Sequence, residues 1–143
     1  MEITSPSFDH GSDIPTEFSC DGENLSPELG IENLPDGTVT LALIMDDPDA
    51  PGGTWVHWVA FDFPPTDVIP EGIFFLGLGG NNSWGTTGYG GPCPPSGTHR
   101  YFFKLFALNG TLELPEGSTK EEVLEAMEGL VLDQTELMGR YTR

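Results

Sequence analysis

Four polar side chains lie in stretches of the sequence that are otherwise apolar. Asp47 follows the run "TVTLALIM", His57 sits inside "TWVHWVAFDF", and His99 and Tyr101 open "HRYFFKLFAL". A carboxylate can orient an imidazole by accepting one ring N–H, while imidazole and phenol groups can donate to a bound anion. Taken singly, Asp-Pro-Asp is typical of a turn and a histidine in a strand is typical of a core. Together, the four residues indicate a small-ligand pocket.

The flanking sequence predicts how these residues meet. Residues 38–45, 54–63 and 99–108 have the apolar content of strands and are separated by turn sequences rich in Gly and Pro. If the strands pair antiparallel, the ends that carry the four polar residues meet at one edge of the sheet. Because side chains alternate along a strand, the alternation places three sets on shared faces: Val39, Leu41, Leu43, Met45 and Asp47; Trp55, His57, Val59 and Phe61; and His99, Tyr101, Phe103 and Leu105.

The rest of the chain supports one mainly β domain over residues 1–143 with a short C-terminal helix. Ser118 followed by Glu121 matches a capping box and predicts a helix over 119–129. Residues 136–143 predict a final strand. Residues 77–91 hold seven glycines in fifteen positions, which predicts a long irregular loop that is functional or mobile.

Charge narrows the classes of partner. Five basic residues face 23 acidic ones, for a net charge of −18, and a surface so poor in Lys and Arg is a weak partner for nucleic acid or anionic membranes. Such an excess of acidic residues fits either a protein of a halophilic cytosol or an ordinary acidic protein. The N-terminus has no basic start and no apolar run, and no segment has the length of a membrane span. The predicted location is therefore the cytoplasm.

The cysteines, Cys20 and Cys93, form no C-x-x-C motif, so they cannot make a zinc site by themselves. They could pair if the fold brings them together. In a reducing cytosol two free buried thiols are the expected state.

The stretches "DDPDAPGGTWVHW" and "GYGGPCPPSGTHRYFFKLFAL" resemble the phosphatidylethanolamine-binding protein family, also called Raf kinase inhibitor-like, and its prokaryotic branch in particular. The resemblance extends over nearly the whole chain. It implies a large antiparallel sheet with a smaller sheet on one side and helix on the other. It also implies a cis peptide bond between Ala50 and Pro51.

The resemblance further implies a pocket for phosphate or phosphorylated headgroups. Its polar members would be the same four residues, and its walls would come from two loops. The ligand-binding residues implied in this way are Asp47, His57, His99, Tyr101, Ala50, Pro51, Trp55, Gly91, Pro92 and Cys93.

Three functions follow as hypotheses. The first is a non-enzymatic protein that binds a small anion or phosphorylated ligand and needs no cofactor. The second, by family analogy, is a regulatory inhibitor that binds a kinase or protease. The third is a metal-dependent enzyme, because Asp47, His57 and His99 match the composition of a two-histidine, one-carboxylate metal site. A homodimer is compatible with all three.

Overall fold

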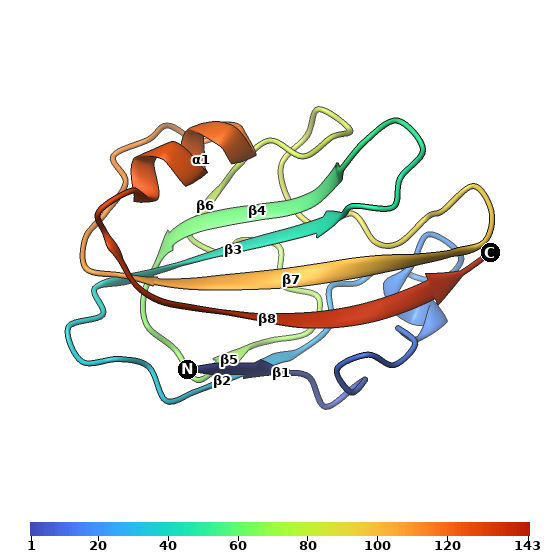
Figure 1. Cartoon of the computed structure of the whole chain (residues 1–143), viewed down its shortest axis with the longest axis horizontal. Coiled ribbons are helices and arrows are strands. Elements are labelled where there is room, and N and C mark those ends of the chain that lie inside the picture. The colour runs from blue at the N-terminus through green and yellow to red at the C-terminus, as the bar shows by residue number, and fades with distance from the viewer.

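The computed structural model describes residues 1–143 and consists of two antiparallel β-sheets and one α-helix (Figure 1). The small sheet has the order β1-β2-β5, formed by Glu2–Thr4, Leu29–Glu32 and Val68–Ile69. The large sheet has the order β6-β4-β3-β7-β8, formed by Leu78–Gly79, Trp55–Phe63, Thr40–Asp47, Thr98–Leu108 and Val131–Thr142. The predicted mainly β, antiparallel fold class with a short C-terminal helix is confirmed.

The large sheet has an apolar layer on each face. A cluster of 19 buried residues fills the space between the two sheets and includes Ile31 and Ile69 from the small one. A second cluster of nine lies under the helix α1 (Lys120–Met127), which contributes Val123 and Met127. Figure 1 shows the small sheet and α1 on opposite sides of the large sheet. This is the layering that the resemblance implied.

The helix starts one residue later than the capping pattern predicted. Thr119, not Ser118, is the N-cap, and its side chain and that of Glu122 satisfy each other's backbone N–H groups. Lys120, in the first turn, donates to the buried Asp46 carboxylate at 2.8 Å and so ties the helix to the sheet. This eight-residue helix is the only α-helix, and none of the helices could cross a lipid bilayer.

Strand boundaries differ from prediction mainly at the C-terminus. The three strands predicted at 38–45, 54–63 and 99–108 appear at 40–47, 55–63 and 98–108. The last strand, predicted at 136–143, is the twelve-residue β8, and it pairs with β7 over nearly its whole length. Residues 77–91 are less irregular than predicted, since they contain β6 and a bridge between Asn81 and Thr87.

A β-bulge corrects the faces predicted for β4. Met45 lies opposite Trp58 and Asp46 lies opposite Val56, so His57 is an extra residue with no partner on β3. An extra residue in one strand reverses the alternation of its side chains between the two faces of the sheet from that residue onward. His57 therefore lies on the pocket side, whereas Val59 and Phe61, predicted on the same face as His57, lie under α1 in the second cluster.

The cysteines form a disulfide, so the expectation of free thiols was wrong. Cys20 follows the 3₁₀ helix η1 (Thr16–Phe18), and Cys93 lies in the loop before β7. The backbone N–H of Cys20 donates to the Pro92 carbonyl at 3.1 Å, and the two cysteine Cα atoms are 5.4 Å apart. A contact across 73 residues cannot be seen in local sequence.

The Ala50–Pro51 bond is trans, which corrects the cis bond implied by the resemblance. The chain reverses two residues later instead. Gly53 adopts a φ of +107°, which glycine tolerates because it has no Cβ, and its N–H donates to the Ala50 carbonyl at 3.1 Å. The reversal at Gly53 makes a cis proline unnecessary for closing this turn.

Candidate functional site

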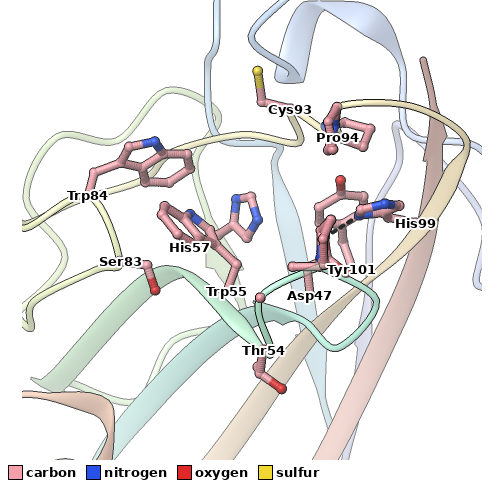
Figure 2. A pocket seen from close by; sticks show the side chains of 15 residues that line it. Asp47, Thr54, Trp55, His57, Ser83, Trp84, Cys93, Pro94, His99 and Tyr101 are labelled. Carbon is pink, nitrogen blue, oxygen red and sulfur yellow. Dashed lines mark hydrogen bonds and ion pairs between the residues drawn. The ribbon is translucent and has the colours of Figure 1, made fainter.

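A pocket of about 620 Å³ opens where β3, β4 and β7 meet the loops at one end of the large sheet (Figure 2). All four polar residues singled out from the sequence line it. So do four of the six predicted wall residues. The full lining is Asp47, Ala50, Pro51, Gly52, Gly53, Thr54, Trp55, His57, Ser83, Trp84, Cys93, Pro94, Pro95, His99 and Tyr101.

Asp47 and His99 form a buried pair at the floor of the pocket. The Nδ1 nitrogen of His99 lies 2.7 Å from the Asp47 Oδ2 oxygen, drawn as a dashed line in Figure 2. The other carboxylate oxygen accepts the backbone N–H of Asp49 at 2.8 Å. Because a carboxylate accepts, Nδ1 carries the proton, and the Nε2 nitrogen of His99 has no partner in the protein. The pair thus holds one imidazole in a fixed orientation, as predicted from the residue types.

His57 is fixed in a similar way, but by the backbone. Its Nδ1 nitrogen lies 2.7 Å from the Gly90 carbonyl oxygen, so Nδ1 is the donor and Nε2 is left without a protein partner. Burial lowers the pKa of this imidazole, and the Gly90 carbonyl and the Asp47 carboxylate offset only part of that effect. His57 is therefore neutral at neutral pH.

Tyr101 carries the only lining hydroxyl that is both fully buried and without a hydrogen-bond partner. Figure 2 shows it pointing toward the loop of Cys93 and Pro94. The Cys93 backbone N–H lies near it without meeting hydrogen-bond geometry. Burial, and then the Asp47 carboxylate, raise the Tyr101 pKa, so the phenol keeps its proton. A buried donor without an acceptor is costly unless a ligand supplies one.

Sequence reasoning missed Trp84 and Ser83, which come from the glycine-rich segment. Trp84 packs edge-on against His57, with ring centroids 5.1 Å apart, and against Trp55, at 5.6 Å. Asn82 shapes this turn, because its side-chain oxygen accepts the backbone N–H groups of Trp84 and Thr86 at 3.0 and 3.2 Å. A tryptophan inside a glycine-rich loop was the available signal.

The remaining missed lining residues continue predicted stretches. Gly52, Gly53 and Thr54 extend the loop from Ala50, and Pro94 and Pro95 follow Cys93. Two predicted wall residues, Gly91 and Pro92, do not line the pocket. Gly91 lies against the Phe18 carbonyl and donates its N–H to the Asn24 side chain at 2.8 Å. Gly91 and Pro92 therefore support the pocket wall from the side that faces away from the cavity.

No Lys or Arg side chain lines the pocket. All five basic side chains of the protein form ion pairs with aspartates: Arg100 with Asp49, Lys104 and Lys120 with Asp46, Arg140 with Asp13, and Arg143 with Asp21. An anion in this pocket would therefore be bound by neutral donors, such as the Tyr101 hydroxyl, and by imidazole N–H groups.

A metal ligand set of three or more His, Cys, Asp or Glu side chains is absent from the structure. In the pocket, Asp47 already accepts from His99, and each histidine has its Nδ1 nitrogen engaged. The structure thus adds no observation in favour of the metal hypothesis.

Comparison with known proteins decides the family. The model of the phosphatidylethanolamine-binding protein family matches residues 4–142.

This chain belongs to the phosphatidylethanolamine-binding protein family.

Relatives and solved structures agree with this assignment. A UPF0098 protein of Methanothermobacter thermautotrophicus is 46% identical, over 100% of this chain and 99% of its own. The crystal structure of a phosphatidylethanolamine-binding protein homologue of Chlamydia trachomatis superposes with a TM-score of 0.95 at 39% identity, covering 99% of this chain and 96% of the other. YbcL of Escherichia coli, described as a member of the mammalian family, gives 0.91 at 29% identity, covering 99% and 98%. The resemblance read from the sequence is confirmed.

The buried imidazole of His57 predicts a pH dependence of stability in this family member. In the unfolded chain His57 binds a proton near pH 6.5, whereas the folded chain binds it only at lower pH. The unfolded state then holds more protons, so stability falls as the pH drops below about 6.5. Urea unfolding of the wild type and His57→Asn between pH 5 and 7.5 measures this. Asparagine keeps a donor for Gly90 but does not titrate, so the wild type should lose more stability on acidification. If the difference in unfolding free energy between the wild type and His57→Asn stayed constant from pH 7.5 to pH 5, His57 would not be the group responsible for the pH dependence.

Proposed function

We propose that this protein is a non-enzymatic binding protein whose pocket takes a small anion or a phosphorylated headgroup such as phosphate or phosphoethanolamine. The observation that carries this proposal is the Tyr101 hydroxyl, buried and without an acceptor at the end of a pocket. Membership of a family named for a phospholipid supports the class of ligand.

The two imidazoles supply the rest of the recognition. Each presents an Nε2 nitrogen that no protein group uses. A neutral Nε2 accepts from a protonated phosphate, and a protonated Nε2–H donates to a phosphate oxygen. Each of these two hydrogen bonds requires one additional proton, which is carried by the phosphate in the first case and by the imidazole ring in the second. Affinity should therefore be higher at pH 6 than at pH 8.

The carboxylate of Asp47 is compatible with an anionic ligand because it is already occupied. It accepts from His99 and from the Asp49 backbone, so it holds the ring instead of meeting the ligand directly. With a net charge of −18 on the protein, we expect modest affinity.

Titration calorimetry with inorganic phosphate and with phosphoethanolamine at pH 6 tests the proposal. Tyr101→Phe should weaken binding about 10- to 100-fold, since a hydrogen bond to a charged group contributes about 1.5–3 kcal/mol. His99→Ala should weaken it as well. Tyr101→Phe should not destabilise the fold, because the lost hydroxyl has no partner in the protein.

Tyr89→Phe is the matched control. It also removes a tyrosine hydroxyl, but one outside the pocket lining that donates to the Phe18 carbonyl at 2.7 Å. It should cost about 1 kcal/mol of stability and leave phosphate affinity unchanged. Equal affinities for wild type, Tyr101→Phe and His99→Ala, or no binding by the wild type, would refute the proposal. Zinc or iron titration in the same experiment would reveal the metal-dependent alternative.

A further inference from the structure

The Cys20–Cys93 disulfide lies at the rim of the candidate pocket, where a soluble reductant can reach it. Both cysteines are exposed. Cys93 lines the pocket and continues into Pro94 and Pro95, which line it too. Any freedom gained by Cys93 would therefore change the wall of the pocket.

The Cys20 side of the bond is held firmly without the disulfide. The neighbouring Phe18 and Ser19 are buried. The Ser19 hydroxyl lies 2.7 Å from the Thr16 carbonyl oxygen, to which it donates, and 3.0 Å from the Tyr141 oxygen. Tyr141 in turn donates to Asp21 at 2.6 Å. These contacts fix residues on both sides of Cys20 to η1 and β8.

The Cys93 side has fewer contacts, although Pro94 is buried. No backbone–backbone hydrogen bond involves residues 93–96, and Pro94 and Pro95 have no N–H to donate. The nearest such bonds are at the two ends of this stretch: the Pro92 carbonyl accepts from Cys20 at 3.1 Å, and Gly97 exchanges bonds with Arg143 at 2.8 and 3.1 Å. The disulfide is therefore the main tether of this wall segment.

We propose that the Cys20–Cys93 disulfide is a redox-sensitive clamp on the pocket, reduced by a dithiol such as the paired cysteines of a thiol–disulfide reductase. A thiolate of the dithiol attacks the Cys20 sulfur, the sulfur–sulfur bond breaks, and Cys93 leaves as a thiolate that takes up a proton. The second thiol of the reductant then attacks the mixed disulfide and releases Cys20. The protein gains two electrons and two protons, and the dithiol becomes a disulfide.

Arg143 favours Cys93 as the leaving group. Its Nη1 nitrogen lies 3.5 Å from the Cys93 sulfur, while Nη2 pairs with Asp21 at 3.2 Å. A guanidinium beside sulfur stabilises the negative charge that develops as the bond breaks. The anchored Cys20 is then the sulfur that is attacked, and the loosely held Cys93 is the one that moves.

Opening the clamp should weaken ligand binding, a step that rests on the proposed function. The Cys93 loop packs above the Tyr101 hydroxyl (Figure 2), so a mobile loop no longer closes the pocket over that donor. Coupling between two sites is reciprocal. A bound ligand should therefore also oppose reduction by the same factor.

Amide hydrogen exchange of the full chain, with and without dithiothreitol, tests the clamp without any ligand. Reduction should speed exchange of the Gly97 and Cys20 amides, whose hydrogen bonds to Arg143 and Pro92 flank the wall segment, and leave Phe18, Ser19 and the central strands protected. Unchanged exchange of Gly97 and Cys20, or a general loss of protection throughout the chain, would overturn the proposal.

Calorimetry with inorganic phosphate at pH 6 forms the second arm. The reduced protein should bind about tenfold more weakly than the oxidised protein, and equal affinities would overturn the coupling. If the oxidised protein does not bind phosphate, the proposed function fails, and the exchange data still decide whether reduction releases the wall.

Reduction kinetics give an independent check on the leaving group. Arg143→Gln should slow reduction by dithiothreitol several-fold. Arg140→Gln, which removes the same charge from an ion pair with Asp13, should not. Equal slowing by both substitutions would mean that net charge, and not the contact with Cys93, controls the rate.

Discussion

Replacing both Cys20 and Cys93 with serine is expected to lower the free energy of unfolding by about 4 kcal/mol. The disulfide spans 73 residues, about half of the chain. Without it, the unfolded chain regains the entropy that this large loop had removed. Neither apolar cluster includes a cysteine, so the variant should still fold.

Urea unfolding of oxidised wild type and the double variant measures this effect. Wild type in dithiothreitol should match the variant, and the variant should be insensitive to dithiothreitol. A loss below about 1 kcal/mol would show that the disulfide contributes little to global stability. The local clamp inferred above does not depend on this number, because it concerns the mobility of residues 93–97 alone.

Gly91→Ala should destabilise the protein by about 3 kcal/mol, although Gly91 lies neither in the pocket lining nor in a strand. A methyl group at this position would collide with the Phe18 carbonyl and the Asn24 side-chain oxygen. The backbone must then separate from η1, which also strains the Cys20–Pro92 hydrogen bond. Overpacking against backbone costs about 1–3 kcal/mol, and loss of the Asn24 bond adds to it.

Gly52→Ala provides the control for this prediction. Gly52 lies in the other loop of the pocket, where an added methyl group would meet no heavy atom within 4 Å, and its backbone does not require a positive φ. Its substitution should change stability by no more than about 0.5 kcal/mol. Thermal or urea unfolding of both variants measures the difference. Equal effects would contradict the close packing of Gly91 on η1.

The two largest effects concern the same small region, where η1 meets the loop before β7. Gly91, Pro92 and Cys93 attach this loop to the η1 region by a hydrogen bond to Asn24, a hydrogen bond from Cys20 and a covalent bond. Pro94 and Pro95, which line the pocket, follow directly after these attachments. The wall of the pocket is therefore positioned by contacts of the loop with the η1 region.

The amino-acid sequence by itself determined four of the five strands of the large sheet, all but β6, and singled out the four polar residues that line the pocket together. Alternation along β3 and β7 places Asp47, His99 and Tyr101 on the face of Met45 and Phe103, and both of these lie in the core between the sheets. Alternation is a local property of an extended backbone, so a single sequence suffices. The family could be identified from two long motifs, because the residues of each motif are contiguous in the sequence.

Tertiary structure decided the remaining features. Val59 and Phe61 turn away from the face of Trp55 and His57 because β4 has one more residue than β3 between Met45 and Asp46, a count that depends on how two strands pair. The glycine-rich segment carries Trp84 to His57 through a turn that Asn82 organises. The pairing of Cys20 with Cys93, and the position of Gly91 behind the wall and not on it, depend on the docking of η1 on the loop before β7. Such contacts join residues far apart in the chain, and local patterns of polarity carry no information about them.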